Sequence, residues 1–87
     1  MLKITYSDRF IKHYRKLTDV EKRQLKSKLS MFADDPFHPS LRTKRIQGTD
    51  ALFEFSVNMD IRVIWFFDGE DVVILLDVGH HDILREY

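Results

Sequence analysis

Residues 61–78 read IRVIWFFDGEDVVILLDV, two apolar runs on either side of Asp68-Gly69. In the first run every second residue is large and apolar, which is the period of a strand that buries one face. The second run is almost continuously apolar, as expected of a strand covered along most of its length. Asp-Gly between two such runs is a strong hairpin signal. The stretch therefore predicts the central hairpin of a β-sheet.

The segments that precede this hairpin continue the two-residue period. LFEFSV at 52–57 alternates apolar and polar residues, and residues 58–60 (NMD) are expected to turn the chain back. LRTKRIQ at 41–47 can form another strand, followed by a turn at 48–50. Four consecutive strands are therefore expected in the second half of the chain.

The first half has the signals of two helices. LKITY at 2–6 alternates and predicts a short strand, after which Ser7 suits the start of a helix. Thr18 and Glu21 have the spacing of a capping box, so a second helix is expected to begin there. Two aspartates and a proline at 34–36 end it.

The order of these elements is β-α-α-β-β-β-β. It predicts an α+β fold in which an antiparallel sheet is covered on one face by an N-terminal helical hairpin. With 87 residues and no linker or repeat, residues 1–87 are expected to form a single domain.

Composition limits the classes of protein that fit. No apolar run approaches the roughly 18 to 20 residues that cross a membrane, and no signal peptide opens the chain. The absence of cysteine fits a reducing cytoplasm, which is the expected location. The net charge is zero, but residues 1–47 carry 12 Lys/Arg against 5 Asp/Glu and residues 48–87 carry 2 against 9. The first half therefore suits an acidic partner or a polyanion, or is a solvated helix surface facing a compensating sheet.

Strand register predicts a polar site. If residues 58–60 form a loop, Ser56 lies opposite Arg62, and a two- or four-residue turn at Asp68-Gly69 places Arg62 opposite Leu75 or Asp77. Either turn puts Arg62 and Asp77 on the same face, away from the helices. The polar residues expected on that face and at its end are Glu54, Ser56, Arg62, Asp77, His80 and His81.

These side chains allow more than one interpretation. Arg62 could form a cross-strand ion pair with Asp77 or Glu54, or bind an anion through its planar guanidinium. A histidine at the end of the sheet could be structural, or a general acid or base. Adjacent residues of a strand point to opposite faces, so His80 and His81 are not expected to share a metal ion.

The sequence accordingly predicts no metal site and no cofactor. His13, on a helix, and His38, in a loop between two prolines, are expected to be surface residues.

In their order and spacing, HPSLRTKRIQG (38–48), IRVIW (61–65), the aspartate-glycine hairpin and LLDVGHHDILREY (75–87) resemble the RelE/ParE superfamily of bacterial toxins. The resemblance covers nearly the whole chain and is strongest in residues 36–87. It implies the same fold of a compact sheet carrying two N-terminal helices.

The resemblance also implies an activity. Members of the RelE branch are endoribonucleases, or mRNA interferases, that cut mRNA in the A site of the ribosome and so inhibit translation. The implied reaction is attack of a ribose 2′-hydroxyl on the adjacent phosphate without a metal ion. The partners implied are mRNA, the ribosome and a cognate antitoxin, expected to be an amphipathic chain that folds around the toxin.

By position, the resemblance implies catalytic roles for four residues. Arg62 matches the family's arginine in the middle of the sheet, which stabilises the phosphate. His81 matches a histidine of YafQ-like members and is the expected general acid or base. Tyr87 matches a C-terminal aromatic residue that stacks on the substrate or helps to activate it. Asp60 resembles a catalytic aspartate of the YafQ-like branch, although a turn explains it equally well.

One pair of positions departs from RelE, which has two lysines where this chain has Glu54 and Ser56. Either Glu54 acts as a base or RNA cleavage is weak or absent. Phosphate contacts are then expected from the strand before it and from the end of the sheet, through Arg42, Lys44, Arg45 and His80.

Two other functions fit the same resemblance. A ParE-like protein would inhibit DNA gyrase without chemistry of its own, and an inactive relative would only bind the antitoxin. A fold does not distinguish these functions, because function depends on the site.

Overall fold

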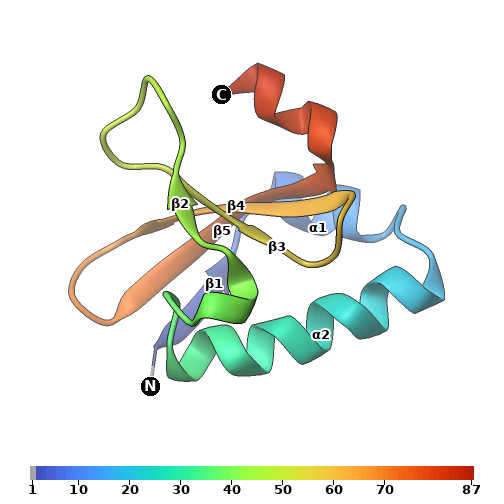
Figure 1. Ribbon diagram of the computed structural model, residues 1–87, viewed down its shortest axis with the longest axis horizontal. Helices are drawn as coiled ribbons and strands as arrows, with labels where there is room; N and C mark the ends of the chain where they lie inside the picture. The colour runs from blue at the N-terminus through green and yellow to red at the C-terminus, as the bar shows by residue number, and fades with distance from the viewer. Residues whose placement is uncertain (1) are drawn as a thin grey trace.

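One β-sheet and four helical segments make up residues 2–87, the part of the chain that the computed structural model describes (Figure 1). In chain order the elements are β1 (Lys3–Tyr6), α1 (Asp8–Tyr14), α2 (Asp19–Asp34), the 3-10 helix η1 (Pro39–Leu41), β2 (Lys44–Arg45), β3 (Phe53–Ser56), β4 (Ile61–Phe67), β5 (Val72–His80) and the 3-10 helix η2 (His81–Glu86). The fold is of the α+β class, as the sequence predicted. No helix among these residues is long and apolar enough to span a membrane.

The sheet is mixed, not antiparallel as expected. Its strand order is β1-β5-β4-β3-β2, and β1 runs parallel to β5 while the other three pairs are antiparallel. A short turn forces consecutive strands to run antiparallel. β1 and β5 are separated by most of the chain, so no such turn fixes their direction, and the alternation of residues 2–6 did not reveal it.

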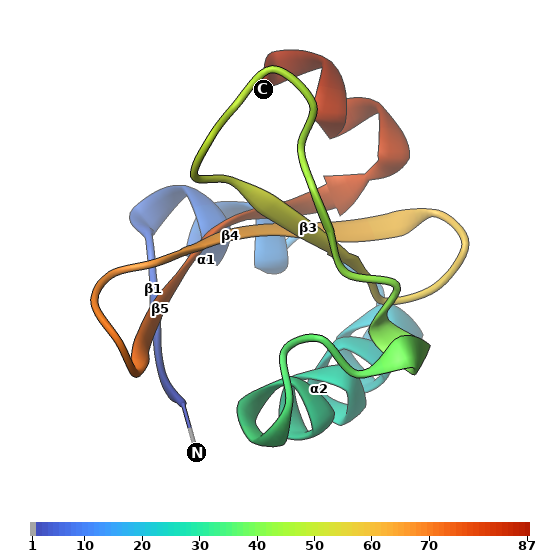
Figure 2. The same ribbon diagram turned by 60° about the vertical axis from the view of Figure 1, so that its left-hand side comes forward.

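The helices lie on different sides of this sheet. Figures 1 and 2 show α2 across one face and η2 on the opposite side, with α1 beside β5. The core between α2 and the sheet is aromatic: the ring of Phe32 lies 5.0 Å from that of Phe55 and meets Trp65 edge-on at 4.8 Å. All three side chains are fully buried. This packing fixes α2 on the sheet.

Both α-helices begin where the sequence indicated. Ser7 is the N-cap of α1, and its hydroxyl accepts a hydrogen bond from Phe10 N. Thr18 caps α2 in a complete capping box with Glu21, in which each side chain accepts from the backbone N–H of the other residue. These caps satisfy N–H groups that have no partner within the helix.

The strand predicted over residues 41–47 is mostly wrong. Only Lys44 and Arg45 pair with β3. Leu41 ends η1, which Pro39 begins, and is buried, and Arg42 has the left-handed backbone conformation with φ +53°. That conformation interrupts extended backbone, so Arg42 lies before the strand and not on it.

The connection between β4 and β5 differs in length from the expectation of two or four residues. Phe67 pairs with Val73, and Asp68 N donates to Val72 O, which leaves residues 69–71 as a three-residue loop. An odd number of loop residues reverses the predicted parity of the two strands.

A β-bulge in β5 reverses the parity of the two strands a second time. Trp65 pairs with Leu75 but Ile64 pairs with Asp77, so Leu76 is an extra residue.

The two shifts cancel in their effect on side-chain direction. With the three-residue loop alone, Asp77 would lie opposite Val63 and face the core. With the loop and the bulge together, Arg62 lies opposite Gly79 and not opposite Leu75 or Asp77. Arg62 and Asp77 therefore still face the same side of the sheet, as the sequence predicted, although the expected register was wrong.

The bulge is also where α1 is attached. Ser7 N donates to Leu75 O at 3.0 Å, and the Ser7 hydroxyl donates to Leu76 O at 2.5 Å. The same hydroxyl caps α1. One serine therefore fixes the start of α1 against the irregular part of β5.

We expect Phe32→Ala to lower the free energy of unfolding by about 3–5 kcal/mol, because it leaves a cavity between α2 and the sheet. Val20→Ala, at an exposed apolar site on the same helix, is the control and should change it by less than about 0.5 kcal/mol. Denaturant unfolding followed by fluorescence of Trp65, the single tryptophan, measures both. Equal losses in the two variants would contradict this packing.

Candidate functional site

The centre of the candidate site is Asp77, a carboxylate with no exposed surface. Its Oδ1 accepts hydrogen bonds from His13 Nδ1 at 2.5 Å and from Val78 N at 2.8 Å. Its Oδ2 accepts from Arg9 Nε at 3.0 Å and from the Tyr87 hydroxyl at 2.8 Å. A carboxylate offers about four lone-pair positions, and here each has a donor.

Arg9 connects the two helices that meet over this carboxylate. Its guanidinium pairs with Glu86 as well as with Asp77, and it lies 5.7 Å from the centre of the Tyr87 ring. Arg9 belongs to α1, whereas Glu86 and Tyr87 lie at the end of η2. Asp77 and Arg9 together therefore hold α1 and η2 against the same part of β5.

Sequence reasoning missed this cluster. Arg9 was not singled out, and the expectation that His13 is a surface residue was wrong, since only 28% of its side chain is exposed. Two signals were available: Arg9 and His13 are four residues apart on one helix face, and Asp77 is the single charge in the apolar run of β5. Nothing local in the sequence joins residues that are 64 and 68 positions apart.

Tyr87 is held as a neutral phenol. Burial, followed by the hydrogen bond to Asp77 and the charge of Asp77, raises its pKa to about 12. The ionised form would place a second negative charge beside the carboxylate. Near neutral pH the hydroxyl is therefore a donor to Asp77.

A second polar row crosses β2, β3 and β4 through Glu54, which is almost fully buried. Glu54 Oε1 lies 3.8 Å from Arg62 Nε and 4.0 Å from Lys44 Nζ. Arg62 Nη1 also donates to the backbone oxygens of Asn58 at 2.8 Å and Ile61 at 3.2 Å. The ion pair considered for Arg62 is thus present with Glu54, while Asp77 has other partners.

Arg62 opens onto a cavity of about 250 Å³ at the β3–β4 turn. Lys28 of α2 and Arg42 line the same cavity, together with Ser40 and Ser56. Three cationic side chains around one hollow can bind a phosphate group.

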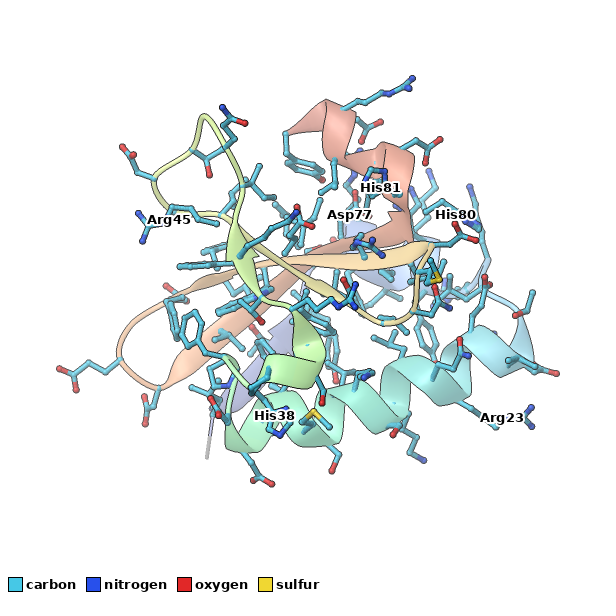
Figure 3. All side chains as sticks on the ribbon, viewed as in Figure 1. Arg23, His38, Arg45, Asp77, His80 and His81 are labelled. Carbon is cyan, nitrogen blue, oxygen red and sulfur yellow. The ribbon has the colours of Figure 1, made fainter. Side chains whose placement is uncertain are left out.

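The other predicted site residues are spread over the same end of the sheet and its edge. His80 ends β5 and His81 begins η2, and both are exposed (Figure 3). Asp60 is exposed in the β3–β4 turn, where its N–H is bound by Asn58 Oδ1. Arg45 is exposed on the short edge strand β2.

Within residues 2–87 the Arg62 cavity includes neither His81 nor Tyr87 in its lining. Arg62 and these two residues were expected to share one patch, but Tyr87 belongs to the Asp77 cluster and His81 is exposed at the start of η2, outside the Arg62 cavity. Over the same residues, no group of three or more His, Cys, Asp or Glu side chains is placed to hold a metal ion.

Comparisons with known proteins show the fold. No protein-family model and no curated protein matches the sequence. Among solved structures, Escherichia coli YafQ superimposes with a TM-score of 0.74 at 16% identity, covering 97% of this chain and 98% of that one. The intact E. coli RelBE toxin–antitoxin complex contains a chain with a TM-score of 0.73 at 22% identity, covering 91% and 95%.

A copper-bound mutant toxin of Helicobacter pylori gives a TM-score of 0.71 at 22% identity, covering 97% and 99%. The chain has the fold of the RelE and YafQ toxins.

In this RelE/YafQ-type fold, η2 packs directly onto β5 through Gly79. A Cβ atom at Gly79 would lie 2.7 Å from Cγ2 of Ile83, closer than such atoms approach. Glycine therefore lets η2 lie close enough for Tyr87 to reach Asp77.

We expect Tyr87 to ionise with a midpoint near pH 12, because burial and Asp77 oppose ionisation. Its titration is measured as the difference in tyrosinate absorbance between the wild-type protein and Tyr87→Phe. The folded pKa lies above the usual value of about 10. The stabilisation from this hydroxyl is therefore complete below about pH 10 and lost as the pH rises toward 12. A midpoint near pH 10 in this difference would show that Tyr87 is not held by Asp77.

Proposed function

We propose that the protein is the toxin of a type II toxin–antitoxin system and cuts mRNA on the ribosome in the cytoplasm as a metal-independent endoribonuclease. The observation that carries this proposal is the cavity of about 250 Å³ at Arg62, which Lys28 and Arg42 line as well. The fold shared with RelE and YafQ supports it.

Arg62 is the residue that stabilises charge in the proposed reaction. Two backbone oxygens and Glu54 hold its guanidinium in place, and 16% of its side chain remains exposed at the cavity. A cation that is fixed before the substrate binds stabilises the pentavalent phosphate without reorganising in the transition state. Glu54, between Arg62 and Lys44, would orient the arginine.

The remaining residues take roles around this centre. His81 is the proton-transfer residue that the family resemblance implies. Tyr87, which follows η2, donates its hydroxyl to Asp77 and holds that carboxylate in place. Arg42, Lys44, Arg45 and His80 would contact the phosphates of the RNA. Asp60, exposed at the neighbouring turn, would act as the catalytic aspartate of the YafQ-like pattern.

We expect Arg62→Ala to lower the rate of mRNA cleavage in a translating extract by about 100-fold or more, because the developing charge on the phosphate loses its stabiliser. Arg62→Lys should restore only part of the rate, since an ammonium lacks the planar fork. Arg23→Ala removes the same charge from the exposed side of α2 and should cut like the wild type.

Wild-type cleavage by folded Arg62→Ala would contradict the proposal. Intact transcripts together with reduced DNA supercoiling would indicate a gyrase inhibitor instead.

The proposed partner is a cognate antitoxin, and a groove between β1, α1 and α2 suits it. The groove has a volume of about 420 Å³ and an aromatic and aliphatic floor that includes Tyr6, Phe10 and Ile11. Arg15, Lys22 and Lys26 line it as well, and Tyr6 and Ile11 are exposed. An amphipathic segment with acidic residues beside its apolar face complements this groove.

We expect Ile11→Glu to weaken binding of the small protein encoded beside the gene by about 10-fold or more, since it places a charge on an apolar floor. Val20→Glu makes the same kind of change at an exposed apolar site outside the groove and should leave binding unchanged. Calorimetry on the purified pair measures both. Equal affinities for the two variants would exclude the groove as the binding surface.

A further inference from the structure

The geometry of the Asp77 cluster fixes one tautomer of His13. A buried carboxylate accepts hydrogen bonds, so the ring nitrogen 2.5 Å from Oδ1 must donate. This places a proton on Nδ1 and leaves Nε2 of the neutral ring without one. Because Asp77 also has Arg9, Tyr87 and Val78 as donors, its own position is fixed.

His13 is not enclosed by this network. It lines a cavity of about 250 Å³ between α1, the end of β5 and the start of η2. His80 and Lys16 line the same cavity, and Leu17 and Ile83 form its apolar walls. An imidazole that a buried carboxylate orients through one nitrogen, and that borders an open cavity, has the arrangement of a general base.

The cavity lies close to the Arg62 site. Gly79, in its wall, is the strand partner of Arg62, and His80 is the partner of Ile61. The two hollows therefore lie at the same end of the β4–β5 pair. A nucleic-acid backbone that crosses this end would pass both.

We propose that this cavity holds the attacking ribose of the RNA substrate, with the phosphate that it attacks directed toward Arg62, and that His13, positioned by Asp77, accepts the proton of the 2′-hydroxyl. The inference rests on the proposed function and deepens it, because cleavage needs two proton-transfer groups and the family resemblance supplied one, His81. Lys16 provides positive charge for the RNA backbone. Asp82 also lines the cavity; its exposed carboxylate opposes an anion, but solvent screens it.

In the proposed step one bond to phosphorus forms as another breaks, and one proton is taken up as another is released. The 2′-hydroxyl gives its proton to Nε2 of His13 as its oxygen forms a bond to phosphorus. The bond from phosphorus to the 5′-oxygen breaks, and that oxygen takes a proton from the ring of His81, the proton-transfer residue of the proposed function. The products are a 2′,3′-cyclic phosphate and a 5′-hydroxyl, and neither water nor an oxidant is consumed.

His13→Asn separates proton transfer from structure. Its side-chain amide can still donate to Asp77, but no atom replaces Nε2. We expect cleavage in a translating extract to fall by about 100-fold or more while thermal unfolding stays close to the wild type. His38→Asn is the matched control, because His38 caps η1, away from the cavity, and should cut normally.

A binding measurement on the wild-type protein tests the cavity without activity. The probe is a dinucleotide whose reactive 2′-hydroxyl is replaced by hydrogen, so that it binds and is not cut. In NMR of the ring nitrogens, the signals of His13 and His80 should shift on addition while those of His38 do not. No shift at His13, or an equal shift at His38, would overturn the assignment of the cavity.

The two proposals fail in different ways. If the wild type leaves RNA intact, the proposed function falls, and the dinucleotide titration alone decides whether the cavity binds a ribose. If Arg62→Ala abolishes cleavage while folded His13→Asn cuts like the wild type, the nuclease stands and His13 is not its base.

Discussion

A buried carboxylate is tolerated in a protein only when donors replace the water that it has lost, and Asp77 imposes this constraint on the whole molecule. Its donors come from α1, from the last residue of the chain and from its own strand. Removing one partner from a buried ion pair commonly costs about 3–5 kcal/mol. The positions of α1 and η2 are therefore linked through one side chain, and the polar end of the sheet is organised around it.

The sequence predicted the elements better than their connections. Caps and alternating residues are local signals, so the starts of both helices and the pairing of Ser56 with Arg62 could be read from them. The parallel pairing of β1, the three-residue loop and the bulge at Leu76 have no local signature. Asp77 shares a side of the sheet with Arg62, as predicted, because the last two shifts cancel. The expectation that this side lies away from the helices was wrong, since Arg9 and His13 of α1 bind Asp77.

The same distinction explains what was found of the candidate site. The polar face around Arg62 and Glu54 follows from strand parity, and the structure places these two side chains 3.8 Å apart. The partners of Asp77 do not follow from parity, because Arg9 and His13 belong to a helix far away in the chain. Tyr87 was expected beside Arg62, but its hydroxyl binds Asp77.

Identities of 16–22% with YafQ, RelE and the H. pylori toxin leave most surface positions different while the backbone is shared. A fold of this kind is held by its apolar core, which here includes the aromatic cluster of Phe32, Phe55 and Trp65 between α2 and the sheet. Function depends on the site and not on the fold. The polar side chains of the two candidate sites line neighbouring hollows on either side of the β4–β5 pair, one cationic and one bordered by imidazoles.

The extra residue in β5 has an evolutionary consequence. Its carbonyl is the acceptor for Ser7, and Ser7 sets where α1 starts and hence where His13 meets Asp77. Homologues that lack this one-residue insertion would keep the same strand partners but lose one of the two hydrogen bonds by which Ser7 attaches the helix. Three features should therefore be inherited together in homologues: the inserted residue in β5, a hydroxyl residue before the first helix, and the histidine–aspartate pair.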